Sequence, residues 1–222
     1  MTEPGDYTTE TGDMFAVHAA LQGAFDAAGT LVAGAGTDPD KVGTVASYYA
    51  NVIEFLHVHH TGEDELVFPV LAERCPGRDE VIARVGSQHT QLDGPMAAAD
   101  AALEAWRTSP TPATGAEAVA RLAAIGAAVR PHFADEETEI LPLASAYLNQ
   151  EEWSELPGHS LRSFRRDKPW LALGLVRERL DEEHRARMLE GMPPPVRQRW
   201  LDEGEPAFVS FIAEVRAVGA PA

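Results

Sequence analysis

The sequence predicts an all-α fold: an antiparallel up-down-up-down four-helix bundle followed by a C-terminal helical extension. Alternating runs of β-branched residues, which are typical of strands, are almost absent. Four long alanine-rich stretches with helical periodicity are separated by short glycine- and proline-containing breaks. Short connections favour antiparallel neighbours, as in a bundle. We assign the bundle to residues 10–150 and the extension to residues 151–222.

The first two helices are delimited by glycine and proline. The first is expected over residues 13–32, because the glycine-containing run 33–36 follows it. The second is expected to begin after Asp38, an N-cap residue followed by Pro39 at the first helical position. It should continue to about Arg74.

The third and fourth helices are expected over residues 79–107 and 114–148. A break of threonine, serine and proline separates them, and Thr114 with Glu117 resembles a capping box. Pro69, Pro131 and Pro142 lie inside expected helices and should kink or end them, because proline lacks a backbone donor.

The extension carries no motif with an evident chemical role. A helix is expected over residues 169–190, and after three consecutive prolines two shorter helices are expected over 196–202 and 206–218. The extension should either cap the bundle or form the contact of a homodimer.

Composition excludes several classes of protein. The chain has 222 residues, with 18 Lys and Arg against 35 Asp and Glu and a net charge of −17. This charge opposes binding to nucleic acids and membrane surfaces, which present phosphates. The single Cys75 excludes an internal disulfide framework. The polar N-terminus resembles no secretory signal, and no apolar run reaches the ~18 residues of a membrane span, so we expect a cytoplasmic protein.

One motif occurs twice, in the second and fourth expected helices. His59-x-x-x-Glu63 and His132-x-x-x-Glu136 are each followed by a proline at the same interval. A histidine in the preceding helix, His18 or His89, lies at nearly the same distance before each motif. The chain therefore contains two related helical hairpins.

This spacing points to a metal site. Residues four apart lie on one face of a helix, so an imidazole and a carboxylate can reach the same metal cluster. Two facing helices would bring His59, Glu63, His132 and Glu136 together, and the histidines of the preceding helices would add two imidazoles. Such a set suits iron, with carboxylates bridging two ions. One such pair alone is usually a solvated ion pair, but the duplication favours metal binding.

The second helix leaves a choice of register, because His60 with Asp64 has the same spacing as His59 with Glu63. Matching the prolines selects His59, whose helix face is mostly apolar. We therefore expect His57 and His60 on the surface or around the ligands. His159 and His184 should be exposed to solvent.

The ordered set of His18, His59-x-x-x-Glu63, His89 and His132-x-x-x-Glu136 resembles the hemerythrin-like (HHE cation-binding) family, in its bacterial type. The resemblance spans residues 10–150. It implies a left-handed four-helix bundle with a non-haem di-iron centre of the Fe–O–Fe type. It further implies His18 and His59 on one iron, His89 and His132 on the other, and both glutamates bridging.

The chain departs from the oxygen-carrying hemerythrins at Asp93, one turn after His89, where they have a fifth histidine. We expect Asp93 to orient an imidazole or to be exposed, and the missing imidazole to leave one more open metal position. The small ligand is then oxygen, nitric oxide or peroxide, in sensing or in the response to oxidative stress. The alternative is an enzyme that decomposes peroxide or reduces oxygen. A ferritin-like site is disfavoured, because Glu54-x-x-His57 occurs only once.

Overall fold

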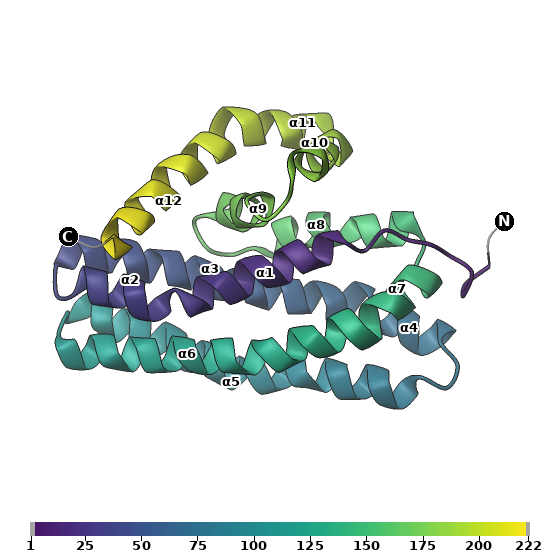
Figure 1. The fold of residues 1–222 in the computed structure, drawn as a ribbon, viewed down its shortest axis with the longest axis horizontal. Coiled ribbons are helices and arrows are strands. Elements are labelled where there is room, and N and C mark those ends of the chain that lie inside the picture. Colours follow the sequence, from purple (N-terminus) through teal and green to yellow (C-terminus); the bar gives the residue numbers. More distant parts are fainter. Residues whose placement is uncertain (1–2, 221–222) are drawn as a thin grey trace.

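The computed structural model describes residues 3–220, and over this range the chain is helical with no strand (Figure 1). The predicted all-α bundle with a C-terminal helical extension is confirmed. Within the same range, no helix combines the length and apolar character needed to cross a membrane.

The bundle consists of four long rods that lie side by side (Figure 1). Three of the rods are divided into shorter segments. In chain order the segments are α1 (Asp13–Asp26) and α2 (Ala28–Ala35), α3 (Pro39–Leu66) and α4 (Phe68–Arg74), α5 (Asp79–Thr108), and finally α6 (Pro112–Asp135), the π-helical turn η1 (Glu136–Ile140) and α7 (Leu141–Tyr147).

Threonine or aspartate followed by proline begins two of these helices. The Asp38 side chain accepts hydrogen bonds from the backbone N–H groups of Asp40 and Lys41, as predicted. The fourth rod begins earlier than expected, because Thr111 rather than Thr114 is its N-cap. Thr114 is the third helical residue, and its side chain completes the capping box in place of Glu117.

The internal prolines act unequally. The second rod is interrupted at Val67, two residues before Pro69, and Pro142 is the second residue of α7, which follows η1. Pro131 does not end its helix, since α6 continues through it, as α5 continues through Pro95. Pro131 is exposed, so water can bind the carbonyl group that loses its helical donor there.

The extension has more helices than predicted. These are α8 (Gln150–Ser163), α9 (Pro169–Arg177), α10 (Glu182–Gly191), α11 (Pro194–Arg199), the π-helical turn η2 (Trp200–Gly204) and α12 (Glu205–Gly219). The helix expected over 169–190 is two helices, because Asp181 accepts a hydrogen bond from the His184 N–H and caps α10. The missed α8 begins with a capping box of Asn149 and Glu152.

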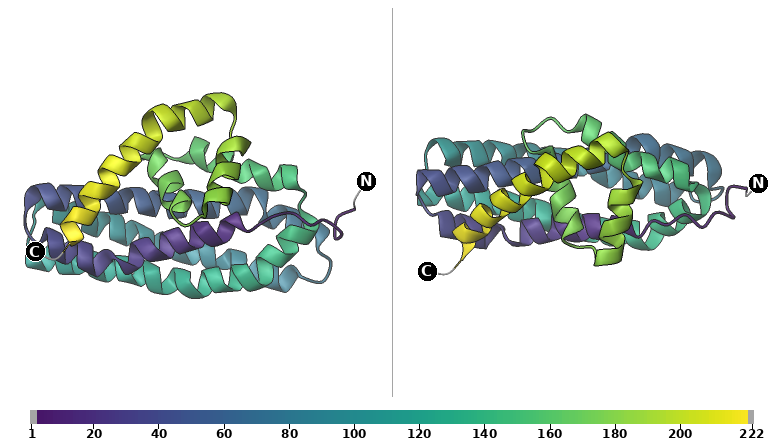
Figure 2. Two further views of the ribbon diagram at one scale, coloured as in Figure 1. Left: turned by 45° about the horizontal axis from the view of Figure 1, so that its top comes forward. Right: turned by 90° about the horizontal axis from the view of Figure 1, so that it is seen from above.

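The extension covers one side of the bundle, as one of the two predicted arrangements requires. Figure 2 shows α12 crossing the bundle obliquely, and α12 contacts α2 and α3. Leu171 of α9 and Phe208 and Val218 of α12 belong to the same apolar cluster as Leu31 and Tyr49 of the bundle. The extension therefore completes the main core. A homodimer remains a prediction.

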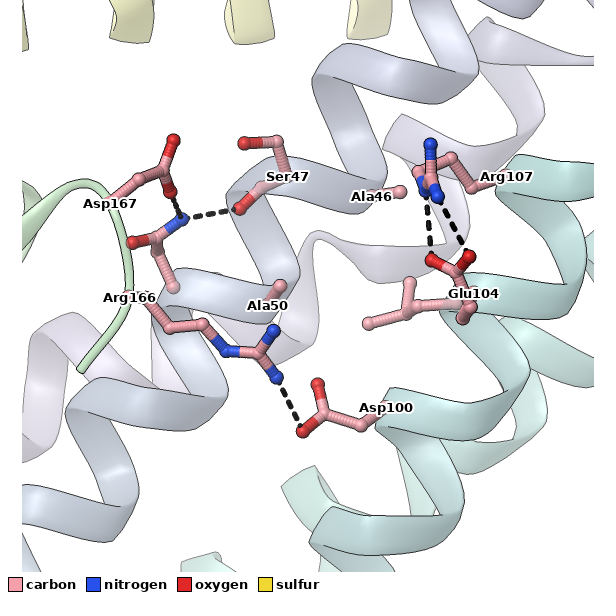
Figure 3. Close-up of a pocket in the computed structure, with 10 residues that line it drawn as sticks. Ala46, Ser47, Ala50, Asp100, Glu104, Arg107, Arg166 and Asp167 are labelled. Atoms are coloured by element: carbon pink, nitrogen blue, oxygen red, sulfur yellow. Dashed lines mark hydrogen bonds and ion pairs between the residues drawn. The ribbon is translucent and has the colours of Figure 1, made fainter.

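The linker between α8 and α9 is tied to the bundle by polar contacts (Figure 3). The buried Asn51 donates a hydrogen bond to Asp167 Oδ1 at 3.0 Å and accepts one from the Lys168 N–H at 3.0 Å. Arg166 pairs with Asp100 of α5 at 2.8 Å. These contacts line a surface pocket, where the Arg107 guanidinium is also paired, with Glu104. The polar side chains around this pocket thus hold the linker against the bundle.

The contact between α2 and α12 gives a stability prediction. A methyl group on Gly34 would lie 2.0 Å from the backbone oxygen of Val218, so α12 would have to shift. We expect Gly34→Ala to cost about 1–3 kcal/mol and to lower the Tm by about 2–4 °C per kcal/mol. Gly29→Ala in the same helix is the control, because nothing lies within 4 Å of its added methyl group. An equal Tm for the two variants would show that this contact is dispensable.

Candidate metal centre

The predicted ligands converge inside the bundle, and each is at most 6 % exposed. They come from all four rods, so each rod contributes at least one side chain to a common centre. His18 lies in α1, His59 and Glu63 in α3, His89 in α5, His132 at the end of α6, and Glu136 at the first position of η1.

The side chains form two adjoining groups of possible metal ligands. One group contains His18, His59, Glu63 and Glu136, and the other contains three histidines: His60, His89 and His132. Within each group one ligand atom of every residue lies within 4.8 Å of the others. The pairing of His18 with His59, and of His89 with His132, is the one that the family resemblance implied.

The two carboxylates of the first group also face the second group. Glu136 Oε2 is 3.3 Å from His18 Nε2, and its Oε1 is 3.3 Å from His89 Nε2. Glu63 Oε2 is 3.6 Å from His59 Nε2 and 3.7 Å from His89 Nε2. Each glutamate therefore reaches imidazoles of both groups, which is the arrangement that a bridging carboxylate needs.

His60 is buried beside the predicted ligands and falls in one of the two groups that could hold a metal, so the expectation of a surface position was wrong. The residue is 3 % exposed, and its ring stacks on that of His89 at a centroid distance of 4.2 Å. His59 instead faces α1, with its ring 5.3 Å from that of His18. Consecutive helix residues point about 100° apart, and α3 has neighbours on several sides, so two adjacent faces of α3 are buried.

The other residues considered from sequence lie outside the centre. His57 and Asp93 are exposed. Tyr48, earlier in α3 than His59, also lies outside the centre and packs on Tyr49 in the core, where burial raises its pKa to about 12. His184 is exposed as expected, but His159 is only 12 % exposed and pairs with Glu65 at 2.8 Å, so its predicted exposure was wrong.

Three of the imidazoles each have a side-chain oxygen atom within hydrogen-bond distance of Nδ1. His18 Nδ1 is 2.9 Å from Glu137, His89 Nδ1 is 2.8 Å from Asp64, and His132 Nδ1 is 2.9 Å from Gln88. In each case Nδ1 faces outward, so Nε2 faces the centre. From sequence, Asp64 was considered only as the partner of His60 in the alternative register, and neither Glu137 nor Gln88 was singled out.

Several atoms in the centre lack a partner with hydrogen-bond geometry among the described residues. They are Nε2 of His18, His59 and His132, both ring nitrogens of His60, and Oε2 of both Glu63 and Glu136. Buried polar atoms without partners are costly. Nitrogen and carboxylate atoms facing one another across a buried space fit transition-metal ions, which would bind them directly.

Burial shapes the protonation of this centre. It lowers the pKa of His59 and His60 well below the ordinary value, and that of His132 to about 4. Burial and the charge of Glu136 raise the pKa of Glu63. Burial opposes ionisation of Glu136 too, but the adjacent imidazoles of His18 and His89 outweigh it and lower its pKa. Neutral imidazoles are the form that binds metals.

Acidification should destabilise the metal-free protein. Because His59, His60 and His132 have lowered pKa values, between about pH 6 and 5 only the unfolded chain binds those three protons. The raised pKa of Glu63 acts oppositely, since the folded chain there keeps one proton that the unfolded chain loses. The free energy of unfolding should therefore decrease as the pH is lowered from about 6 to 5, by about 1.4 kcal/mol per pH unit for each additional proton that the unfolded chain binds. Thermal unfolding of chelator-treated protein along a pH series measures this, and a constant Tm would contradict it.

Comparison with known proteins identifies the bundle. The family profile described as the hemerythrin HHE cation binding domain matches residues 10–144, which is more than half of the chain and includes every member of both ligand groups. Neither a search of curated proteins nor a search of solved structures returned a significant match. The match, the bundle and the buried histidines and glutamates agree, and the chain belongs to the hemerythrin HHE cation-binding domain family.

Proposed function

We propose that this chain is a non-haem di-iron protein that binds oxygen, nitric oxide or peroxide in the sensing of these molecules or in the response to oxidative stress. The observation that carries the proposal is the pair of adjoining ligand groups with Glu63 and Glu136 between them. Two groups with shared carboxylates favour a dinuclear centre over a single ion.

The donor set favours iron over zinc. His18 and His59 would hold one ion, His60, His89 and His132 would hold the other, and the two glutamates would serve both. Zinc prefers four ligands in a tetrahedron, whereas five imidazoles and two carboxylates suit ions of higher coordination number. When bound, such ions supply electrons and open positions for a small ligand.

His60 changes the expectation that the centre lacks a fifth imidazole, which was based on Asp93. A fifth imidazole is present, but α3 supplies it instead of α5. The ion held by His18 and His59 has one imidazole fewer than its neighbour, so we place the small ligand there. Phe133 stacks on His18 at a centroid distance of 4.1 Å, and its apolar ring limits water in this part of the centre.

Metal analysis and spectroscopy test the proposal. Untagged protein should contain two iron ions per chain, and zinc or a single ion would contradict the di-iron assignment. Anaerobically reduced protein exposed to air, or to nitric oxide, should then form a stable adduct with a new optical absorption. Catalytic release of oxygen from peroxide would instead support the alternative, a peroxide-decomposing enzyme. No spectral change with any of the three ligands would refute small-ligand binding.

A further inference from the structure

The two glutamates of the repeated motif are each followed by a second acidic residue. Asp64 follows Glu63 in α3, and Glu137 follows Glu136 in η1. Both acids lie at the edge of the centre, since the Asp64 side chain is 48 % exposed and that of Glu137 is 30 % exposed. Neither acid belongs to the two ligand groups.

Each acid reaches a histidine of the other hairpin. Asp64 Oδ1, from the first hairpin, lies 2.8 Å from Nδ1 of His89 in the second. Glu137 Oε1, from the second hairpin, lies 2.9 Å from Nδ1 of His18 in the first. The two contacts involve corresponding positions of the two repeats. This correspondence argues that they are part of the centre and are not chance surface pairs.

The contacts determine which ring nitrogen faces inward. A carboxylate only accepts hydrogen bonds, so Nδ1 of each histidine must donate, and Nε2 is left with its lone pair toward the centre. A carboxylate behind a metal-binding imidazole fixes the ring orientation and makes the nitrogen a stronger ligand. Glu137 thus holds the His18 ring from the outer side, while on the inner side Glu136 Oε2 lies 3.3 Å from Nε2 without a hydrogen bond.

We propose that Asp64 and Glu137 are positioning residues that orient His89 and His18 across the hairpin boundary and strengthen metal binding, one at each metal position. Asp64 serves the His60–His89–His132 group, and Glu137 serves the His18–His59 group. This inference rests on the proposed metal centre, but it does not depend on which small ligand the centre binds.

The third contact of this kind has no counterpart in the repeat. His132 Nδ1 lies 2.9 Å from Gln88 Oε1, and the Gln88 amide donates to Asp135 at 2.9 Å, which in turn pairs with Arg84 at 2.6 Å. Gln88 directly precedes His89, whereas Val17 precedes His18. Valine cannot accept a hydrogen bond, so the pair of acids is the part of this outer arrangement that both hairpins share.

Cobalt(II) titration in competition with a chelator tests the inference without iron or oxygen. Loss of an outer partner typically weakens metal binding ~10–100-fold, so we expect Asp64→Ala to weaken one bound cobalt ion by this factor and Glu137→Ala to weaken the other. Asp64→Asn and Glu137→Gln keep an accepting oxygen and should recover most of the affinity. Asp93→Ala, which removes an exposed charge one turn from His89, is the matched control.

A second measurement separates positioning from general stability. In the zinc-loaded protein, the Nδ1 protons of His18 and His89 should exchange slowly with water and be visible by NMR. Asp64→Ala should remove only the His89 signal, and Glu137→Ala only the His18 signal. If wild-type protein takes up no cobalt, the metal centre itself is refuted and the inference falls with it. If it takes up cobalt but both alanine variants behave like Asp93→Ala, only the positioning role is refuted.

Discussion

Glu136→Gln should reduce the iron content from the two ions per chain that we propose to one or fewer. The carboxylate of Glu136 is 1 % exposed and lies 3.3 Å from imidazole nitrogens of both ligand groups. Glutamine keeps the size of the side chain but carries no charge, so it cannot neutralise two cations at once. We expect a larger loss than the ~10–100-fold in affinity that removal of an outer partner costs.

Iron and protein should be quantified on the same purified sample, with thermal unfolding recorded alongside. Glu73→Gln is the matched control, because it removes the same charge from an exposed position of α4. A Glu136→Gln protein that retains two iron ions would rule out the bridging role. Because glutamine preserves the volume in the core, the fold should survive, and the iron content then reports on the carboxylate alone.

In the proposed di-iron centre, His60→Ala should remove the ion assigned to His60, His89 and His132 while leaving the other largely in place. Both ring nitrogens of His60 are buried without a hydrogen-bond partner in residues 3–220, so neutral packing does not explain why a histidine lies there. With His60 gone, His89 and His132 remain as the imidazoles of that group. We expect about one iron ion per chain and a changed optical spectrum.

His57→Ala provides a closely matched comparison, since His57 lies one turn earlier in the same helix and is exposed. This variant should keep both iron ions. Equal iron content in the His57 and His60 variants would return His60 to the role first expected from sequence, that of a residue outside the ligand set.

The predictable part of this centre follows from helix periodicity. His59 with Glu63 and His132 with Glu136 could be recognised because residues four apart share one face wherever a helix lies. The burial of His60 could not be predicted in this way. The prediction assumed that α3 has a single buried face, which is true only of a helix with neighbours on one side, whereas α3 contacts α1, α5 and α8. Asp64 and Glu137 could have been found, because an acid follows the glutamate in both copies of the motif.

Other differences have local causes as well. The missed α8 is rich in charged residues, but Asn149 and Glu152 mark its start as clearly as Asp38 marks that of α3. Pro131 was expected to kink or end its helix, yet α6 continues through it at an exposed position. The sequence patterns thus predicted the four rods of the bundle and the repeated histidine–glutamate pairs. The surroundings of individual side chains depend on tertiary packing and could be seen only in the structure.

The cover formed by α9 and α12 has a practical consequence for anyone dissecting this protein. A fragment ending at residue 144 would contain the whole matched family segment, yet it would expose bundle side chains that now pack beneath Leu171, Phe208 and Val218. Large exposed apolar patches promote aggregation. Truncation at the family boundary should therefore yield insoluble material, and loss of metal in such a fragment would report on misfolding rather than on ligand chemistry.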